Sequence, residues 1–315
     1  MSPPRRWDLL AFGDPCADVV IGVAEVPRAG DKVVGSPLGT FAGGTTANTA
    51  CAFARLGGRA AVYGRVGDDG HAQLLSQSLQ DFGVDTQYLR REPHSASASV
   101  ITLIPPSGER AIVYMPMPPC ELLTLDLAAA LQQSRVLYAM PYALDEFIIA
   151  SSVARNRGTL VAVDIEAAVA PNQEAMQQRL VHADIAFFNE AGFVAGTGAA
   201  PTQAALAALL TGGLQAVVVT LGAAGAMAAI RHGFAQHPAF AQEVVDTTGA
   251  GDTFNAAFLL AMLEGQSLQA GLRFACAAAS HAVTAVGARS GMPDRATVDR
   301  LAATPQASAA VERTC

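Results

Sequence analysis

Short apolar runs recur through the second half of this chain, and a helical stretch separates each run from the next. Strands are expected at residues 136–138, 160–164, 185–188 and 216–220, and helices at 125–133, 145–157, 173–181, 201–212, 252–264 and 267–286. A strand that is apolar at nearly every position is covered on both faces, and strands separated by helices run parallel. The pattern therefore predicts an α/β fold with a parallel sheet between two layers of helices.

The first half adds core elements and two segments of a different kind. Core strands are expected at 9–13 and 60–64, with helices at 45–56 and 71–82. Residues 18–41 form short stretches broken by glycine and proline, and residues 96–116 form two strands around a hairpin-like turn. No linker divides the chain, so we expect one domain over 1–315 with a small β excursion built from these two segments.

Composition narrows the classes of function. The chain has 315 residues, 51% hydrophobic and 15% charged, so it can bury a large core. Its net charge of −7 disfavours nucleic acid or an anionic membrane as a partner, because both require a basic face. The only lysine, Lys32, follows Asp31 rather than a glycine, which excludes a Walker-type phosphate loop.

Targeting patterns are not recognised in the sequence. The apolar stretches are interrupted too often for a membrane-spanning helix, and the first residues do not resemble a signal peptide. The five cysteines include no Cys-x-x-Cys pair, which is typical of free thiols in a reducing compartment. We therefore expect a cytoplasmic protein.

A glycine turn before a helix is the most informative segment for function. Residues 244–255 read VVDTTGAGDTFN. Small residues leave the first N–H groups of a helix uncovered, so Gly249, Ala250 and Gly251 are expected to form an anion site. Asp252 lies inside that site, where a phosphotransferase needs a carboxylate to receive the proton of an attacking hydroxyl. The alternative is that Asp252 only caps the helix.

A second glycine-rich segment precedes an earlier helix. Gly43 and Gly44 allow a ligand to approach the backbone, and Asn48 in the first helical turn can direct an amide at hydroxyl groups. Residues 57–70, GGRAAVYGRVGDDG, follow the same helix. Taken alone, either stretch could be ordinary turn chemistry.

Together these segments resemble the two signatures of the ribokinase-like (phosphofructokinase-B, PfkB) family of sugar and nucleoside kinases. The first signature matches residues 43–70 and the second matches 246–258, and the likeness extends over nearly the whole chain. It implies a three-layer α/β/α ribokinase-like core with a small β lid, made of 18–41 and 96–116, over the acceptor. It also implies an ATP-dependent kinase with an alcohol group as acceptor.

The resemblance assigns roles position by position. Asp252 resembles the catalytic base, and the anion hole is matched by Gly249, Ala250 and Gly251. Acceptor contacts are expected from Asp18, Gly43, Gly44 and Asn48. The nucleotide side is expected to comprise Asn189, Thr220, Gly222 and Gly225. A loop for a monovalent cation, K⁺, is matched by Asp246, Thr248 and Ala288.

One position departs from the family pattern. Many members carry Asn-x-x-Glu, whose glutamate organises water around Mg²⁺, but residues 189–192 read NEAG and place Gly192 in the glutamate position. Either Glu190 or Glu166 could take over this role toward the Mg²⁺ that accompanies ATP. The altered motif is also similar to a ketose-phosphorylating branch of the family, that of ketohexokinase and sulfofructose kinase.

The acceptor is expected to be a ketose or a sugar acid. The lid segments carry only two aromatic residues, Phe41 and Tyr114, whereas a purine favours aromatic faces for stacking. Arg110 on a lid strand either clamps an anionic substituent of the acceptor or is an exposed edge charge.

Two other functions stay open from the residues alone. One is a nucleoside kinase of the same fold, and the other is a sugar- or nucleotide-binding regulator that lacks turnover. The intact Asp252 and its glycine turn favour the kinase, whereas Gly192 favours the regulator. A homodimer formed through the lid is also left open.

Overall fold

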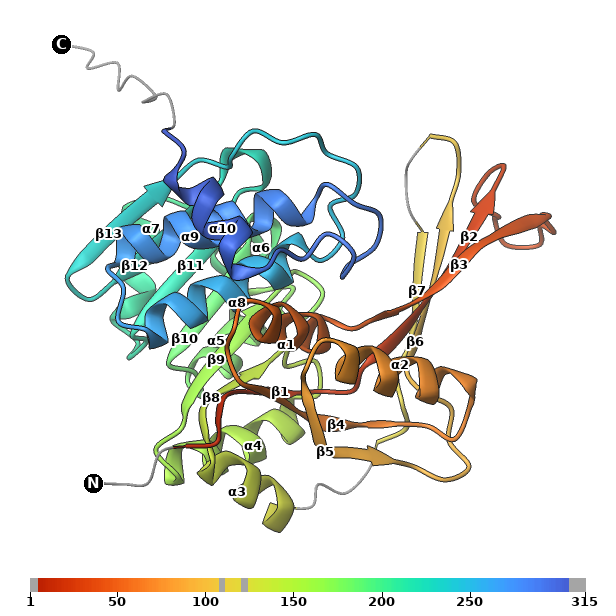
Figure 1. Cartoon of the computed structure of the whole chain (residues 1–315), viewed down its shortest axis with the longest axis horizontal. Helices are drawn as coiled ribbons and strands as arrows, with labels where there is room; N and C mark the ends of the chain where they lie inside the picture. The colour runs from red at the N-terminus through yellow and green to blue at the C-terminus, as the bar shows by residue number, and fades with distance from the viewer. Residues whose placement is uncertain (1–4, 108–110, 120–123, 306–315) are drawn as a thin grey trace.

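The computed structural model describes residues 5–107, 111–119 and 124–305 and is built around one large sheet (Figure 1). Its strand order is β13-β12-β11-β10-β9-β8-β1-β4-β5. Only β12 and β13, at one edge, run antiparallel to their neighbours. The strands are β1 (Trp7–Phe12), β4 (Ala60–Val66), β5 (Asp85–Arg91), β8 (Ser134–Ala139), β9 (Leu160–Ile165), β10 (Ile185–Asn189), β11 (Ala216–Thr220), β12 (Ala226–Ile230) and β13 (Gly233–His237).

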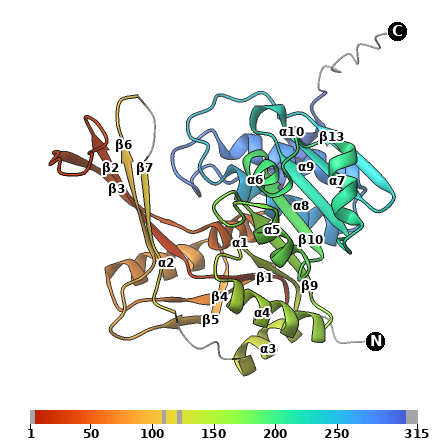
Figure 2. The ribbon, with the colours of Figure 1, turned by 180° about the vertical axis from the view of Figure 1, so that it is seen from behind.

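Helices cover both faces of this sheet (Figures 1 and 2). Successive residues of a strand point to opposite faces, so Leu9 and Phe187 belong to one buried core, and Leu10 and Phe188 to the other. The first core is covered by α1 (Thr45–Arg55), α2 (Gly70–Asp81), α8 (Ala250–Leu263), α9 (Leu268–Ala282) and α10 (Arg295–Ala303). The second is covered by α3 (Thr124–Gln132), α4 (Leu144–Asn156), α5 (Gln173–Leu180), α6 (Glu190–Thr197) and α7 (Gln203–Leu210). The predicted three-layer α/β/α fold is confirmed.

A second, smaller sheet stands beside the core (Figures 1 and 2). Its strand order is β3-β2-β6-β7, and the central pair β2 and β6 is parallel. The strands are β2 (Cys16–Val23), β3 (Gly35–Gly43), β6 (Ser99–Ile104) and β7 (Ala111–Met115). The small sheet expected from the sequence is therefore present.

The carboxyl ends of the parallel strands share one edge of the large sheet. Residues at this edge include Asp14 after β1, Arg65 in β4, Glu166 after β9 and Asn189 at the end of β10. Ligands of open α/β sheets bind at this edge. The fold thus brings polar residues from distant parts of the sequence to one place beneath the small sheet.

Some elements were not predicted. The strand β12 reads AMAAI, and alanine has low β propensity, so its assignment depends on pairing with β11 rather than on local preference. The helix α6 carries two glycines within eight residues and depends on the Asn189 cap. In the described part of the chain, no helix is long and apolar enough to cross a membrane.

Candidate active site

A cleft of about 2550 Å³ lies between the carboxyl edge of the large sheet and the small sheet. The predicted site residues that line it are Asp18, Gly44, Asn48, Glu166, Asn189, Glu190, Thr220, Gly222, Gly225, Asp246, Thr248, Gly249, Ala250, Gly251, Asp252 and Ala288. Gly43 lies behind this surface, where a Cβ atom would come within 2.3 Å of a carboxylate oxygen of Asp18. Arg110 falls outside the described residues.

The first turn of α8 has the small residues that an anion site requires. Gly249 is the N-cap with a left-handed φ of 78°, and no side chain caps the helix. A Cβ atom at Gly249 would lie 2.4 Å from the carbonyl oxygen of Ala288, whereas one at Gly251 would meet open space. Gly249 thus satisfies the backbone turn, and Gly251 leaves the N–H groups accessible. Asp252 is not the helix cap, so that alternative is wrong.

Asp252 is hydrogen-bonded to the helix on the other side of the cleft floor. The amide Nδ2 of Asn48 in α1 donates to Asp252 Oδ2 over 2.8 Å. The pKa of Asp252 is raised to about 7, mainly by burial and also by the nearby Glu166 and Asp18, against the lowering effects of Asn48 and of the charge of Arg289. A carboxyl group with this pKa exchanges a proton near neutral pH.

Asp18 lies on β2 opposite Phe41 of β3, where the small sheet meets the core. Burial raises the pKa of Asp18 to about 6, against the lowering effect of Arg289. Asp18 and Asp252 thus both face the cleft, with Asn48 and Arg289 close to them. These side chains can accept and donate hydrogen bonds to a polyhydroxylated ligand.

Two features of the site were missed by sequence reasoning. One is Arg289, a buried arginine that donates to Asn48 Oδ1 over 2.8 Å. The other is a buried triad in which Asn255 donates to Tyr138 and Asp164 over 2.9 and 3.0 Å, and Tyr138 donates to Asp164 over 3.0 Å. Local sequence carries no signal for these pairs. The one usable sign is that Asn255 follows Asp252 by one helical turn, which puts both on the same face of the helix.

The triad fixes the second turn of α8 to the sheet. Burial, together with Glu166 and Asp252, raises the pKa of Asp164 well above its usual range. The pKa of Tyr138 is likewise raised by burial. Since Asn255 donates to both partners, α8 is held against β8 and β9 by side-chain hydrogen bonds as well as by apolar packing.

Gly192 packs so closely against β9 that a side chain there has no room. A Cβ atom would lie 2.3 Å from the carbonyl oxygen of Ile165 and 2.9 Å from the Cα atom of Glu166. Asn189 caps α6 by accepting from the Gly192 N–H over 2.7 Å. Burial raises the pKa of Glu166, while Glu190 is exposed at the start of α6. The strand end that carries Glu166 therefore occupies the space next to position 192.

The turn after β11 also requires a glycine. Gly225 has a φ of 93°, and a Cβ atom there would lie 2.0 Å from the carbonyl oxygen of His237. The N–H of Leu221 donates to the Gly225 carbonyl over 2.8 Å and closes the turn. Thr220 precedes this closed turn, Gly222 lies within it, and both line the same end of the cleft.

Asp246 joins two loops next to the first turn of α8. Its Oδ1 accepts from the backbone N–H and the hydroxyl of Thr248 over 3.0 and 2.8 Å, and its Oδ2 accepts from the Gly287 N–H over 2.9 Å. The carbonyl of Ala288 then packs against Gly249. The carboxylate of Asp246 thus holds the 287–291 turn next to the first turn of α8.

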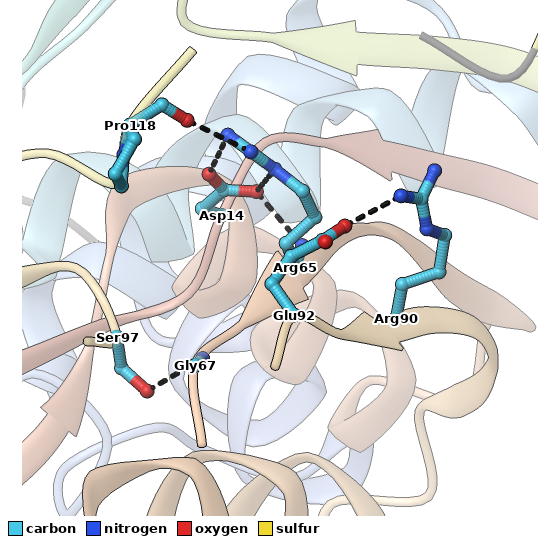
Figure 3. A network of polar contacts seen from close by, with 7 residues as sticks. All are labelled: Asp14, Arg65, Gly67, Arg90, Glu92, Ser97 and Pro118. Atoms are coloured by element: carbon cyan, nitrogen blue, oxygen red, sulfur yellow. Dashed lines mark hydrogen bonds and ion pairs between the residues drawn. The ribbon is translucent and has the colours of Figure 1, made fainter. Parts of the chain in front are cut away.

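The opposite end of the cleft is lined by paired charges (Figure 3). Asp14 accepts from the backbone N–H of Arg65 and from its guanidinium, over 2.7 and 2.8 Å, and Arg65 also donates to the Pro118 carbonyl over 2.9 Å. Arg90 pairs with Glu92 in the same view. The positive charge of both arginines is therefore matched by a neighbouring carboxylate.

Aromatic side chains also line this end, and several come from the core. The rings of Tyr114 on β7 and Tyr142 after β8 lie 6.0 Å apart between centroids. Phe12 and Tyr63 line the cleft as well and are stacked at 5.8 Å. This end of the cleft thus carries more aromatic side chains than the two, Phe41 and Tyr114, that the lid segments contain.

Comparison with known proteins relates the whole chain to one family. A family model described as pfkB family carbohydrate kinase matches residues 8–295. The ribokinase of Bacillus subtilis (strain 168) is 30% identical over 306 residues, which cover 93% of this chain and 99% of that protein. Fructokinase-1 of Oryza sativa subsp. japonica is 27% identical over 93% of this chain and 97% of its own length. The structure of Arabidopsis thaliana ribokinase complexed with ribose and ATP aligns with a TM-score of 0.85 at 29% identity, covering 97% of this chain and 100% of that chain.

Proposed function

The chain belongs to the pfkB family of carbohydrate kinases, and we propose that it transfers the γ-phosphoryl group of ATP to a hydroxyl of a ketose or sugar acid, with Asp252 as the base. Its relatives make it an ATP-dependent sugar kinase rather than a regulator without turnover. The ribose and ATP bound to the Arabidopsis ribokinase support binding of both substrate classes in the cleft.

The position of Asp252 carries the proposal. Its side chain stands in the first turn of α8, next to the accessible backbone at Gly251, and lines the same cleft as Asp18 and Asn48. A carboxyl group there lies between a site for anionic phosphate and a set of groups suited to hydroxyls. Its pKa of about 7 suits a general base that works near neutral pH.

In the proposed step, the acceptor oxygen attacks the γ-phosphorus while its proton passes to the carboxylate of Asp252. The bond from the γ-phosphorus to the β,γ-bridging oxygen breaks, and ADP leaves. The N–H groups of the first turn of α8 stabilise the negative charge of the group in transfer, with Gly249 and Ala250 setting the path of the backbone. Asp18 and Asn48 hold the acceptor hydroxyls.

The donor set of the cleft indicates how Mg²⁺ would be held. Among the described residues, no group of three or more His, Cys, Asp or Glu side chains could hold a metal ion. We therefore expect the ion to be carried mainly by the nucleotide phosphates, whose charge it neutralises. Of the two candidate carboxylates, Glu166 is the one that raises the pKa of Asp252, so it lies close to the reacting centre. We assign the orientation of the ion's water to Glu166.

Potassium is proposed for the loops joined by Asp246. The observation that supports it is the contact of the Ala288 carbonyl with Gly249, because a cation held by neighbouring carbonyls would order the turn that forms the anion site. The side chain of Thr248 is held by the same carboxylate of Asp246, so both loops have a fixed geometry there.

We take the end of the cleft lined by Arg65 and Arg90 as the acceptor end. Of the two expected acceptors, its charges favour a neutral ketose over a sugar acid. Arg65 and Arg90 are each paired with a carboxylate, so an anionic substituent would have to compete with Asp14 or Glu92. The rings of Tyr114 and Tyr142 are equally suited to the apolar face of a sugar ring and to a nucleobase. A nucleoside acceptor is therefore included in the test.

The first prediction concerns the acceptor. In a coupled assay of ADP release with ketoses, aldoses, sugar acids and nucleosides, a ketose should have the highest kcat/KM, ahead of the sugar acids, with product analysis showing transfer to a primary hydroxyl. Deoxy analogues that lack a hydroxyl facing Asp18 should lose several powers of ten in kcat/KM, because a buried polar group is left unpaired. Adenosine as the best acceptor would overturn the choice of sugar and leave the kinase reaction standing.

The second prediction concerns the base. Asp252→Asn keeps the hydrogen bond from Asn48 but loses basicity, so kcat should fall by about 10²–10⁴-fold with little change in KM. For the unchanged protein, kcat/KM should decline as pH falls below about 7, since protonation of Asp252 removes the proton acceptor. Asp299→Asn, an exposed change remote from the cleft, serves as control. Near-full kcat in Asp252→Asn would show that another group is the base.

The third prediction separates the two glutamates. Glu166→Gln should raise the Mg²⁺ concentration needed for half-maximal rate, whereas Glu190→Gln should stay close to the unchanged protein. The reason is that Glu166 is half-buried and raises the pKa of Asp252, whereas Glu190 is exposed. Unchanged Mg²⁺ dependence in both variants would mean that the phosphates alone hold the ion, and an effect in Glu190→Gln alone would reverse the assignment.

The fourth prediction concerns potassium. Titration with KCl, at ionic strength kept constant with tetramethylammonium chloride, should raise kcat to a plateau, since the ion orders the turn at Gly249. A rate that does not respond to KCl contradicts the cation site.

A further inference from the structure

Arg289 is the centre of a hydrogen-bonded network that reaches the proposed base. The residue is only 7% exposed, and its guanidinium donates on three sides. Nε donates to Asn48 Oδ1 over 2.8 Å, Nη1 to the hydroxyl of Ser78 over 2.7 Å, and Nη2 to the carbonyl of Gly43 over 3.0 Å. The arginine thus contacts α1, α2 and the end of β3 at once.

The contact with Asn48 decides how that amide is oriented. An amide has one accepting and one donating end, and the two are exchanged by a rotation of 180°. Because Arg289 can only donate, it holds the Oδ1 of Asn48 and leaves Nδ2 to face Asp252, which accepts it over 2.8 Å. That bond engages Asp252 Oδ2, so Oδ1 is the oxygen left to take up a proton.

Charge gives Arg289 a second effect at the same place. Asp252 is faced by Asp18 from β2, Tyr138 from β8, Asp164 from β9, Glu166 from the segment after β9, and Arg289 from the 287–291 turn. Arg289 is the cation of this group. Its charge opposes the rise in the pKa of both Asp252 and Asp18 that burial causes.

The loop that carries Arg289 is itself attached to the first turn of α8. Gly287 donates to Asp246, and the carbonyl of Ala288 packs against Gly249. The loop of the arginine and the anion site are therefore in direct contact, and the three hydrogen bonds of the guanidinium fix its place relative to Asp252.

We propose that Arg289 is a positioning residue for phosphoryl transfer, which holds Asn48 in the orientation that presents Asp252 to the acceptor and places a positive charge near that carboxyl group. This inference rests on the proposed role of Asp252 as the base. It adds a residue that does not touch the substrates and that acts through Asn48.

The test compares two variants of Arg289 with a matched control. Arg289→Met removes the charge and the hydrogen bonds, and Arg289→Lys keeps a charge but cannot donate on three fixed sides. Arg179→Met is the control, because Arg179 is also 7% exposed and also donates to backbone carbonyls, those of Pro141 and Ala175, but is not among the groups that shift the pKa of Asp252. For each protein, kcat, KM and the pH dependence of kcat/KM are measured, and folding is checked by urea denaturation.

In Arg289→Met, kcat should fall about 10- to 100-fold through misplacement of the base. The acid limb, which is the fall of kcat/KM at low pH, should move to higher pH, because the charge that lowers the pKa of Asp252 is gone. In Arg289→Lys, kcat should fall while the acid limb stays nearer its original position. Arg179→Met should leave the acid limb in place, even if its stability falls.

Two results would overturn the inference: an acid limb and kcat unchanged in Arg289→Met, or an equal shift in Arg179→Met. If Arg289→Met does not fold, Arg289→Lys decides, since the unchanged kcat of a folded lysine variant would exclude a role for the fixed guanidinium. Failure of the proposed function gives a different result. If Asp252 is not the base, Asp252→Asn retains its rate, whereas failure of the Arg289 inference leaves Asp252→Asn impaired and the Arg289 variants unchanged.

Discussion

The hydrogen bond from Asn48 to Asp252 joins two helices that both begin at an uncapped glycine. Gly44 and Gly249 are the N-caps of α1 and α8, with φ values of 93° and 78° and no side-chain cap. Their N-terminal turns lie next to each other at the floor of the cleft, so uncovered N–H groups and a pair of polar side chains are concentrated in a small volume. The relative positions of the acceptor site, the phosphate site and the base all depend on how closely these two turns are held together.

Electrostatics then determines what this volume can do. Several acids are gathered where water is partly excluded, and desolvation favours their neutral forms. Asp252 and Asp18 consequently have pKa values of about 7 and 6. A base of this kind is strong enough to take a proton from a hydroxyl whose acidity rises as it attacks phosphorus. The charge of Arg289 opposes the rise in the pKa of both acids. The arrangement lowers the stability of the fold. An acid whose pKa is raised by folding destabilises the folded state as pH rises from its ordinary pKa to the raised one.

The features that sequence could predict are the local ones. The apolar runs of β9 and β10 and the glycine turn at Gly249 follow from periodicity and helix-start chemistry, which act within a few residues. Arg289 and Asn48 are 241 positions apart, and their contact depends on the packing of two loops that no local pattern encodes. The same holds for Tyr142, which joins Tyr114 only because the small sheet lies over the core. The sequence showed that Gly192 departs from the family pattern. Only the structure shows that the end of β9 packs too closely against this position for a side chain.

The most direct test of this account is the titration of the Asp252 carboxyl itself. Protein labelled with ¹³C at the aspartate carboxyl carbons can be followed by NMR from pH 4 to 9, with the Asp252→Asn variant identifying the resonance. The account predicts a resonance that titrates near pH 7 and is absent from the variant. A resonance of Asp252 that titrates near pH 4, as for an exposed aspartate, would contradict the central claim that this carboxyl is held at the start of α8 as a base for neutral pH.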